Sequence, residues 1–76
     1  MDLPKILGRN VRRVREELTA SQEEIAFRAG INRAYLSDVE RGKRNPTVRV
    51  IGRIAKALDV DPAELFRTPA ERQQKK

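Results

Sequence analysis

The chain has 76 residues, room for a single domain, and its 17 Lys and Arg against 11 Asp and Glu give a formal net charge of +6 at pH 7. This positive balance favours a polyanionic partner, either nucleic acid or an acidic membrane surface. Because Cys and His are absent from the sequence, disulfides, thiolate or imidazole metal ligands and Ser-His or Cys-His nucleophiles are excluded, and we expect no enzyme activity, metal or cofactor.

The first predicted element is a helix over residues 4–18, because Pro4 suits a first helical turn and apolar residues recur behind it at helical spacing. These apolar residues form one inward stripe, consisting of Leu7, Val11, Val14 and Leu18. Thr19 follows the stripe, and its branched side chain disfavours the left-handed backbone that commonly ends a helix. We therefore expect this helix to end in a different way.

Two short amphipathic helices joined by one tight turn are predicted by the stretch SQEEIAFRAGINRAYLSDVERG. Ser21 and Glu24 have the spacing of a reciprocal capping box, Gly30 suits a left-handed helix end, and Asn32 suits the N-cap of the next helix. A connection of only about three residues makes the two helices cross steeply. Phe27 lies off the apolar stripe of the first of them, and we expect it to edge the core.

The outward face of the helix that follows Asn32 carries groups that can read base edges. Arg33 can present its fork to guanine O6 and N7, Ala34 can pack on a thymine methyl, and Ser37 can donate or accept. Asp38 can accept from cytosine N4, or its charge can exclude wrong bases or orient Arg33 or Arg41. These features predict base reading by Arg33, Ala34, Ser37 and Asp38.

Two further helices complete the predicted fold, which is all-α and compact with five helices. Thr47 suits the N-cap of a helix that runs to Leu58, and Asp61 suits the N-cap of a short last helix. The final residues lack an apolar stripe and end in lysines. We expect a domain over residues 1–67 and a basic, disordered tail over residues 68–76.

The stretch SQEEIAFRAGINRAYLSDVERGKRNP resembles the helix-turn-helix of phage-repressor-like bacterial regulators of the xenobiotic-response-element type. Within it, NRAYLSDVERGKRNPT is similar to controller proteins of restriction–modification systems. The likeness covers roughly residues 7–66. It implies a five-helix phage-repressor-like DNA-binding domain whose helix-turn-helix is formed by the second and third helices. The sequence departs from the family at Thr19 and Ala20, where glycine and a large aliphatic residue are usual.

Contacts to DNA phosphates are expected on both sides of the reading helix. Gln22 and Asn32 fall at helix N-termini, where free N–H groups and the helix dipole favour phosphate. The resemblance implies the same role for Gln22 and adds Tyr35, Lys43 and Arg44. The alternative for Lys43 and Arg44 is an ordinary solvated loop.

The resemblance also implies two structural roles. A basic residue at the position of Arg15 pairs in the family with the acidic residue that matches Glu40, so we expect a partly buried ion pair between the first helix and the reading helix. Likeness to controller proteins implies that subunits meet at the last helix and the neighbouring part of the fourth, near Val50, Leu65 and Phe66. The alternative is that these three residues complete one monomer core.

The function that these features predict is that of a transcription regulator that binds double-stranded DNA sequence-specifically, as a homodimer on a near-palindromic operator, in the manner of a restriction–modification controller. Alternatives are the DNA-binding antitoxin of a toxin–antitoxin pair and a basic protein-interaction module of the same fold. RNA polymerase would be a further partner of an activator. No run approaches the roughly 20 apolar residues of a membrane span, so we expect a cytoplasmic protein with no membrane contact. We also expect no small-molecule effector.

Overall fold

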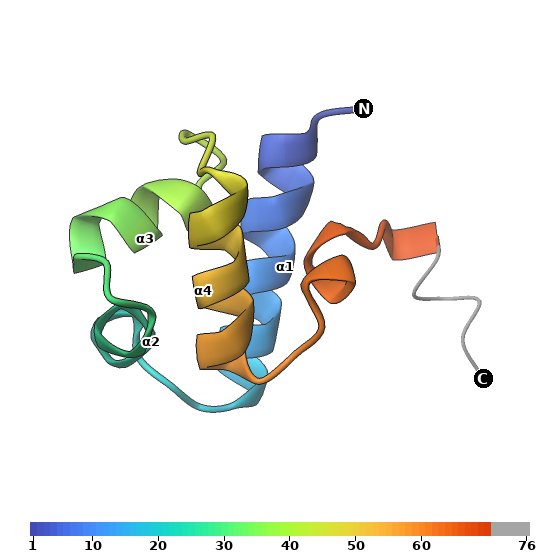
Figure 1. The fold of residues 1–76 in the computed structure, drawn as a ribbon. Coiled ribbons are helices and arrows are strands. Elements are labelled where there is room, and N and C mark those ends of the chain that lie inside the picture. The colour runs from blue at the N-terminus through green and yellow to red at the C-terminus, as the bar shows by residue number, and fades with distance from the viewer. Residues whose placement is uncertain (71–76) are drawn as a thin grey trace.

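The computed structural model describes residues 1–70 of the chain, and these fold into four α-helices and one short 3₁₀ helix. The elements are α1 (Leu3–Glu17), α2 (Gln22–Ala29), α3 (Arg33–Glu40), α4 (Val48–Leu58) and the 3₁₀ helix η1 (Pro62–Phe66). In Figure 1, α1 and α4 lie side by side, with α2 and α3 on one side of them and η1 on the other. Of the predicted tail, residues 71–76 lie outside the described residues. No helix in the described part is long and apolar enough to cross a membrane.

The all-helical fold is as predicted, except that the fifth element is a 3₁₀ helix. Asp61 acts as its N-cap, with the side chain accepting from the Ala63 N–H at 2.8 Å. The Glu64 N–H donates to the Asp61 carbonyl at 2.9 Å, the i to i+3 bond of a 3₁₀ turn. The helix after this cap has only five residues, Pro62–Phe66. A segment of that length is too short for an α-helix to gain from regular i to i+4 bonding.

The caps predicted around α2 and α3 are formed, apart from half of one capping box. Ser21 Oγ accepts from the Glu24 N–H at 3.0 Å, and Asn32 Oδ1 accepts from the Tyr35 N–H at 2.7 Å. Gly30 ends α2 with a φ of 73°, which glycine adopts without steric cost. The Glu24 carboxylate does not complete the box, because it accepts from Arg28 Nη2 at 3.0 Å instead.

The end of α1 differs from the expectation, because Thr19 adopts the left-handed conformation with a φ of 53°. The Ala20 N–H donates to the Arg15 carbonyl at 3.1 Å and the Thr19 N–H to the Glu16 carbonyl at 2.9 Å. Both bonds satisfy carbonyls that a helix end leaves free. A left-handed backbone costs a residue with a Cβ about 1–2 kcal/mol, a cost that these bonds offset.

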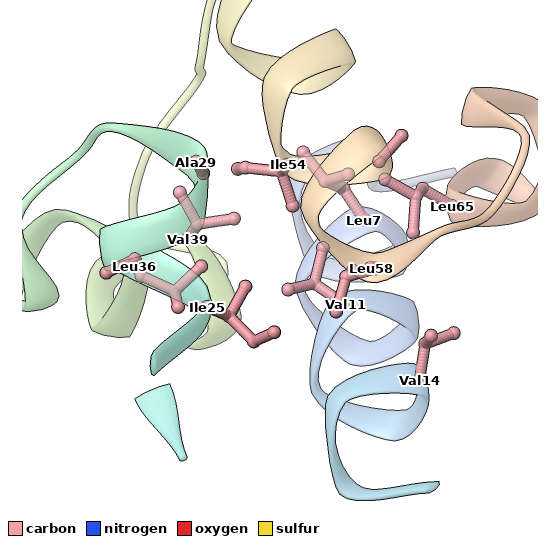
Figure 2. Packing of buried hydrophobic residues seen from close by; sticks show 12 residues of the cluster. Leu7, Val11, Val14, Ile25, Ala29, Leu36, Val39, Ile54, Leu58 and Leu65 are labelled. Atoms are coloured by element: carbon pink, nitrogen blue, oxygen red, sulfur yellow. The ribbon is translucent and has the colours of Figure 1, made fainter. Parts of the chain in front are cut away.

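One hydrophobic core joins all five elements (Figure 2). Its buried members are Leu7, Val11, Val14, Ile25, Ala26, Ala29, Leu36, Val39, Ile54, Ala55, Leu58 and Leu65. The prediction for Phe27 is wrong, since this side chain is 85% exposed. It lies on the face of α2 opposite to Ile25 and Ala29, which contact the core.

Leu65 belongs to the monomer core and is completely buried there, so its side chain is not free to form a dimer contact. Asn10, a buried polar residue of α1, fixes η1 beside it. Asn10 Nδ2 donates to the Leu65 carbonyl at 2.9 Å and to the Arg67 carbonyl at 2.8 Å. Of the two alternatives for Leu65, the structure supports the core.

Candidate nucleic-acid interface

The outward face of α3 brings the four predicted base-reading residues together. Leu36 and Val39 are completely buried and fix the helix against the core. Helical spacing then turns the opposite side of α3 away from the core. On that side Arg33 and Ala34 are exposed and Ser37 and Asp38 are half-buried. The core contacts of α3 therefore determine which side chains face away from the core.

The predicted phosphate-binding residues flank this face. Gln22 begins α2 and is half-buried, and the Asn32 side chain is occupied as the N-cap of α3. After α3, Lys43 and Arg44 are exposed. The Arg44 guanidinium lies over the Tyr35 ring, 4.3 Å from its centroid, in a cation–π contact. This contact holds the Arg44 guanidinium beside α3.

The ion pair between Arg15 and Glu40 is present and links α1 to the end of α3. Arg15 Nε lies 2.6 Å from Glu40 Oε2, and Arg15 Nη2 lies 3.0 Å from Glu40 Oε1. The two side chains are only 12% and 3% exposed. The hydrogen bond to Glu40 raises the pKa of Arg15 above its ordinary value, and the nearby carboxylate charge adds to this effect. The guanidinium also donates to the Ala20 carbonyl at 2.9 Å.

Gln22 extends this pair to the outward face of α3. Its Nε2 donates to Glu40 Oε1 at 2.9 Å, and its Oε1 accepts from Arg33 Nη1 at 3.2 Å. A continuous chain of hydrogen bonds thus runs from Arg15 through Glu40 and Gln22 to Arg33. The sequence predicted a phosphate contact for Gln22 but not this link, which depends on how α2 and α3 cross.

Asp38 does not contact Arg33 but pairs with two other arginines. Its Oδ1 lies 2.7 Å from Arg41 Nη2, and its Oδ2 lies 3.6 Å from Arg44 Nη2. The hydrogen bond from Arg41 lowers the pKa of Asp38, and the charges of both arginines act in the same direction. The carboxylate is therefore ionised at neutral pH.

Arg53 supports the turn between α2 and α3 from α4, a contact that the sequence did not predict. Its Nε donates to the Ala29 carbonyl at 2.9 Å and its Nη2 to the Gly30 carbonyl at 2.7 Å. These carbonyls lie at the C-terminus of α2, where no intrahelical donor is available. Arg53 follows them by more than 20 residues, so no local pattern could have found this contact.

Val50 and Phe66, the other two predicted dimer residues, are half-buried and pack on the edge of the core. Phe66 also lines a shallow, mostly apolar hollow with Leu3, Pro46 and Ile51. Within residues 1–70, no three His, Cys, Asp or Glu side chains are grouped as metal ligands.

Two short helices joined by a tight turn, with the second presenting a polar face flanked by cations, define the helix-turn-helix class. The helix-turn-helix family model matches residues 11–65. The chain therefore belongs to the helix-turn-helix family.

Its relatives include regulators and control proteins of similar length. The chain is 45% identical over 71 residues to an uncharacterized HTH-type transcriptional regulator, y4dJ, of Sinorhizobium fredii, covering 93% of this chain and 91% of that protein. It is 42% identical over 74 residues to the control protein C.BamHI of Bacillus amyloliquefaciens, with coverage of 93% and 91%. The crystal structure of the restriction–modification controller protein C.AhdI from Aeromonas hydrophila superposes with a TM-score of 0.81 at 41% identity, covering 83% of this chain and 96% of that chain. The predicted identity as a helix-turn-helix regulator is confirmed.

Proposed function

We propose that this regulator binds double-stranded DNA sequence-specifically, with α3 in the major groove, and that it controls the expression of restriction–modification genes. The observation that carries the proposal is the outward face of α3, where Arg33, Ala34 and Ser37 lie together. A major groove admits one helix, and its donor, acceptor and methyl patterns distinguish all four base pairs. Similarity to C.BamHI and C.AhdI supports the controller role over that of an antitoxin.

Base reading and phosphate binding fall to different side chains in this proposal. Arg33 has both a free outward position and a hydrogen bond to Gln22 that limits its orientations, which suits bidentate recognition of guanine. We assign base reading to Arg33, Ala34, Ser37 and Asp38. We assign phosphate binding to Gln22, Asn32, Tyr35, Lys43 and Arg44, because contacts beside the reading helix fix its register without reading sequence.

Substitution of Arg33 and Lys43 distinguishes these two roles. Arg33→Ala should relax the preference at one base position, at a cost of about 1–3 kcal/mol on the preferred sequence. Lys43→Ala, which removes an exposed cation of the same turn, should weaken binding to every duplex alike and reduce the slope of log K against log salt by about one. The measurement is fluorescence anisotropy on a preferred and a random duplex over a salt series.

Arg28→Ala is the matched control, because it removes one exposed arginine of α2 that pairs with Glu24, with Arg28 Nη2 3.0 Å from Glu24 Oε2. It should change binding less than either of the other variants. Equal loss on preferred and random DNA for Arg33→Ala would remove Arg33 from the base-reading set. Absence of salt-sensitive DNA binding by the wild-type chain would favour a protein-interaction module instead.

We infer that the regulator acts as a homodimer. A single small DNA-binding module buries only about 600–1,000 Å², which limits its affinity for one half-site. A symmetric pair with reading helices about 34–36 Å apart would engage two half-sites of a near-palindromic operator. Val50 and Phe66 are partly exposed apolar side chains that we assign to this contact. Light scattering at tens of micromolar should give the mass of two chains; a monomer with undiminished operator affinity would contradict the dimer.

The site of action follows from the ligand. DNA in a bacterial cell lies in the cytoplasm, and we place the regulator there. If it activates transcription, RNA polymerase is its further partner. We assign it no small-molecule effector.

A further inference from the structure

Asp38 is an acidic residue in the middle of a face proposed to meet DNA. Its side chain is 32% exposed, and those of Arg41 and Arg44 are 60% and 45% exposed. All three can therefore be reached by a ligand. Arg41 lies one helical turn after Asp38, whereas Arg44 reaches back from the turn beyond α3.

The carboxylate opposes binding to phosphate in two ways. It repels phosphate oxygens directly, because like charges at close range disfavour each other. It also occupies the two guanidinium groups that would otherwise neutralise phosphates, and exposed ion pairs of this kind are weak enough to be exchanged. DNA that draws both Arg41 and Arg44 to its backbone leaves Asp38 without a cationic partner, and DNA that draws one of them leaves it with a single pair.

A base edge can remove this penalty where it presents an N–H donor. The N4 amino group of cytosine or the N6 amino group of adenine can donate to a carboxylate in the major groove. A sequence with such a donor opposite Asp38 compensates the carboxylate, and a sequence without one does not. Discrimination of this type comes from weakening the wrong complexes.

We propose that Asp38 is a specificity-determining residue, whose carboxylate holds Arg41 and Arg44 away from the phosphates of non-operator DNA and is compensated only where a base donates to it. The inference rests on the proposed DNA-binding function. The role of Asp38 differs from simple base reading because the carboxylate mainly changes binding to DNA of the wrong sequence.

The test compares wild type with Asp38→Asn on a random duplex and on a duplex selected from a random pool by the wild-type chain. On random DNA the variant should bind about threefold to tenfold more tightly at 0.1 M salt, with a salt slope steeper by about one unit per subunit, as for one additional phosphate contact. On the selected duplex the gain should be smaller or absent. The ratio of specific to random affinity should therefore fall.

Glu17→Gln is the matched control, because it makes the same change in net charge and also releases an arginine, Arg13, whose Nη1 lies 3.1 Å from the carboxylate. It should leave the affinity ratio unchanged. The effect of Asp38→Asn on random DNA should also shrink in an Arg44→Gln background, since one of the released cations is then missing.

Three results would overturn the inference while leaving the proposed function intact. They are an unchanged ratio in Asp38→Asn, the same change in Glu17→Gln, and unchanged or weaker binding of Asp38→Asn to random DNA. Failure of the wild-type chain to bind any duplex in a salt-dependent manner would instead contradict the proposed function, and this inference with it. Circular dichroism of each variant verifies that the helices are retained.

Discussion

Replacing Gly8 with alanine should destabilise the domain by about 3 kcal/mol or more, because α1 and α3 touch through their backbones at this point. A Cβ on Gly8 would lie 2.2 Å from the Val39 carbonyl oxygen and 2.7 Å from the Glu40 carbonyl oxygen. Both atoms belong to the backbone of α3 and cannot move aside as the end of a side chain can. The helices would have to separate, and the buried contacts of α3 would be lost with them.

Gly52→Ala provides the control, since it makes the same change within another helix. A Cβ on Gly52 would meet no atom within 4 Å. Alanine should therefore stabilise α4 by about 0.5–1 kcal/mol through its better helix propensity. Urea denaturation followed by circular dichroism measures both variants. If both substitutions changed the free energy of unfolding by a similar amount and in the same direction, the close approach of α1 and α3 would not be what excludes a side chain at position 8.

Replacing Glu40 with alanine should cost about 3–5 kcal/mol, since it leaves the largely buried guanidinium of Arg15 without its carboxylate. It also removes the acceptor of Gln22 Nε2 and so the support behind Arg33. We expect lower stability together with weaker base preference. Denaturation and anisotropy on the same preparation measure the two effects.

Glu16→Ala is the matched control for this substitution. Glu16 also pairs with an arginine, Arg12, at 3.0 Å, but both side chains are more than half exposed. Its loss should change the free energy of unfolding by less than about 1 kcal/mol. The double substitution Arg15→Met with Glu40→Leu should be less destabilising than Glu40→Ala alone, because no unpaired charge remains. Equal costs for Glu40→Ala and Glu16→Ala would contradict a buried structural role.

Most of the fold could be predicted from the sequence because it is specified locally. Apolar spacing identified α1, and the caps at Ser21, Asn32, Thr47 and Asp61 depend on residues within one turn of each other. The backbone conformation of Thr19 was mispredicted because the prediction considered only the steric preference of threonine itself. The helix end is instead determined by hydrogen bonds from the Ala20 and Thr19 N–H groups to the carbonyls of Arg15 and Glu16. Phe27 was mispredicted because aromatic residues are usually buried, and this one is not.

The candidate site could be predicted only in part. Helical periodicity places Arg33, Ala34, Ser37 and Asp38 on one face, and family resemblance supplied the pair of Arg15 and Glu40. The partners of these side chains depend on how separate helices cross, which sequence spacing does not encode. The hydrogen bonds of Gln22 to Glu40 and Arg33 could not be predicted for this reason. The same holds for the bonds of Arg53 to the end of α2.

Selection of bound sequences from a randomised duplex pool by the purified chain is the most direct test of sequence-specific recognition by α3. We expect enrichment of a near-palindrome whose two half-sites lie about one helical turn apart, with a guanine at the position that Arg33→Ala relaxes. Salt-sensitive binding with no sequence enriched over the starting pool would contradict sequence-specific recognition.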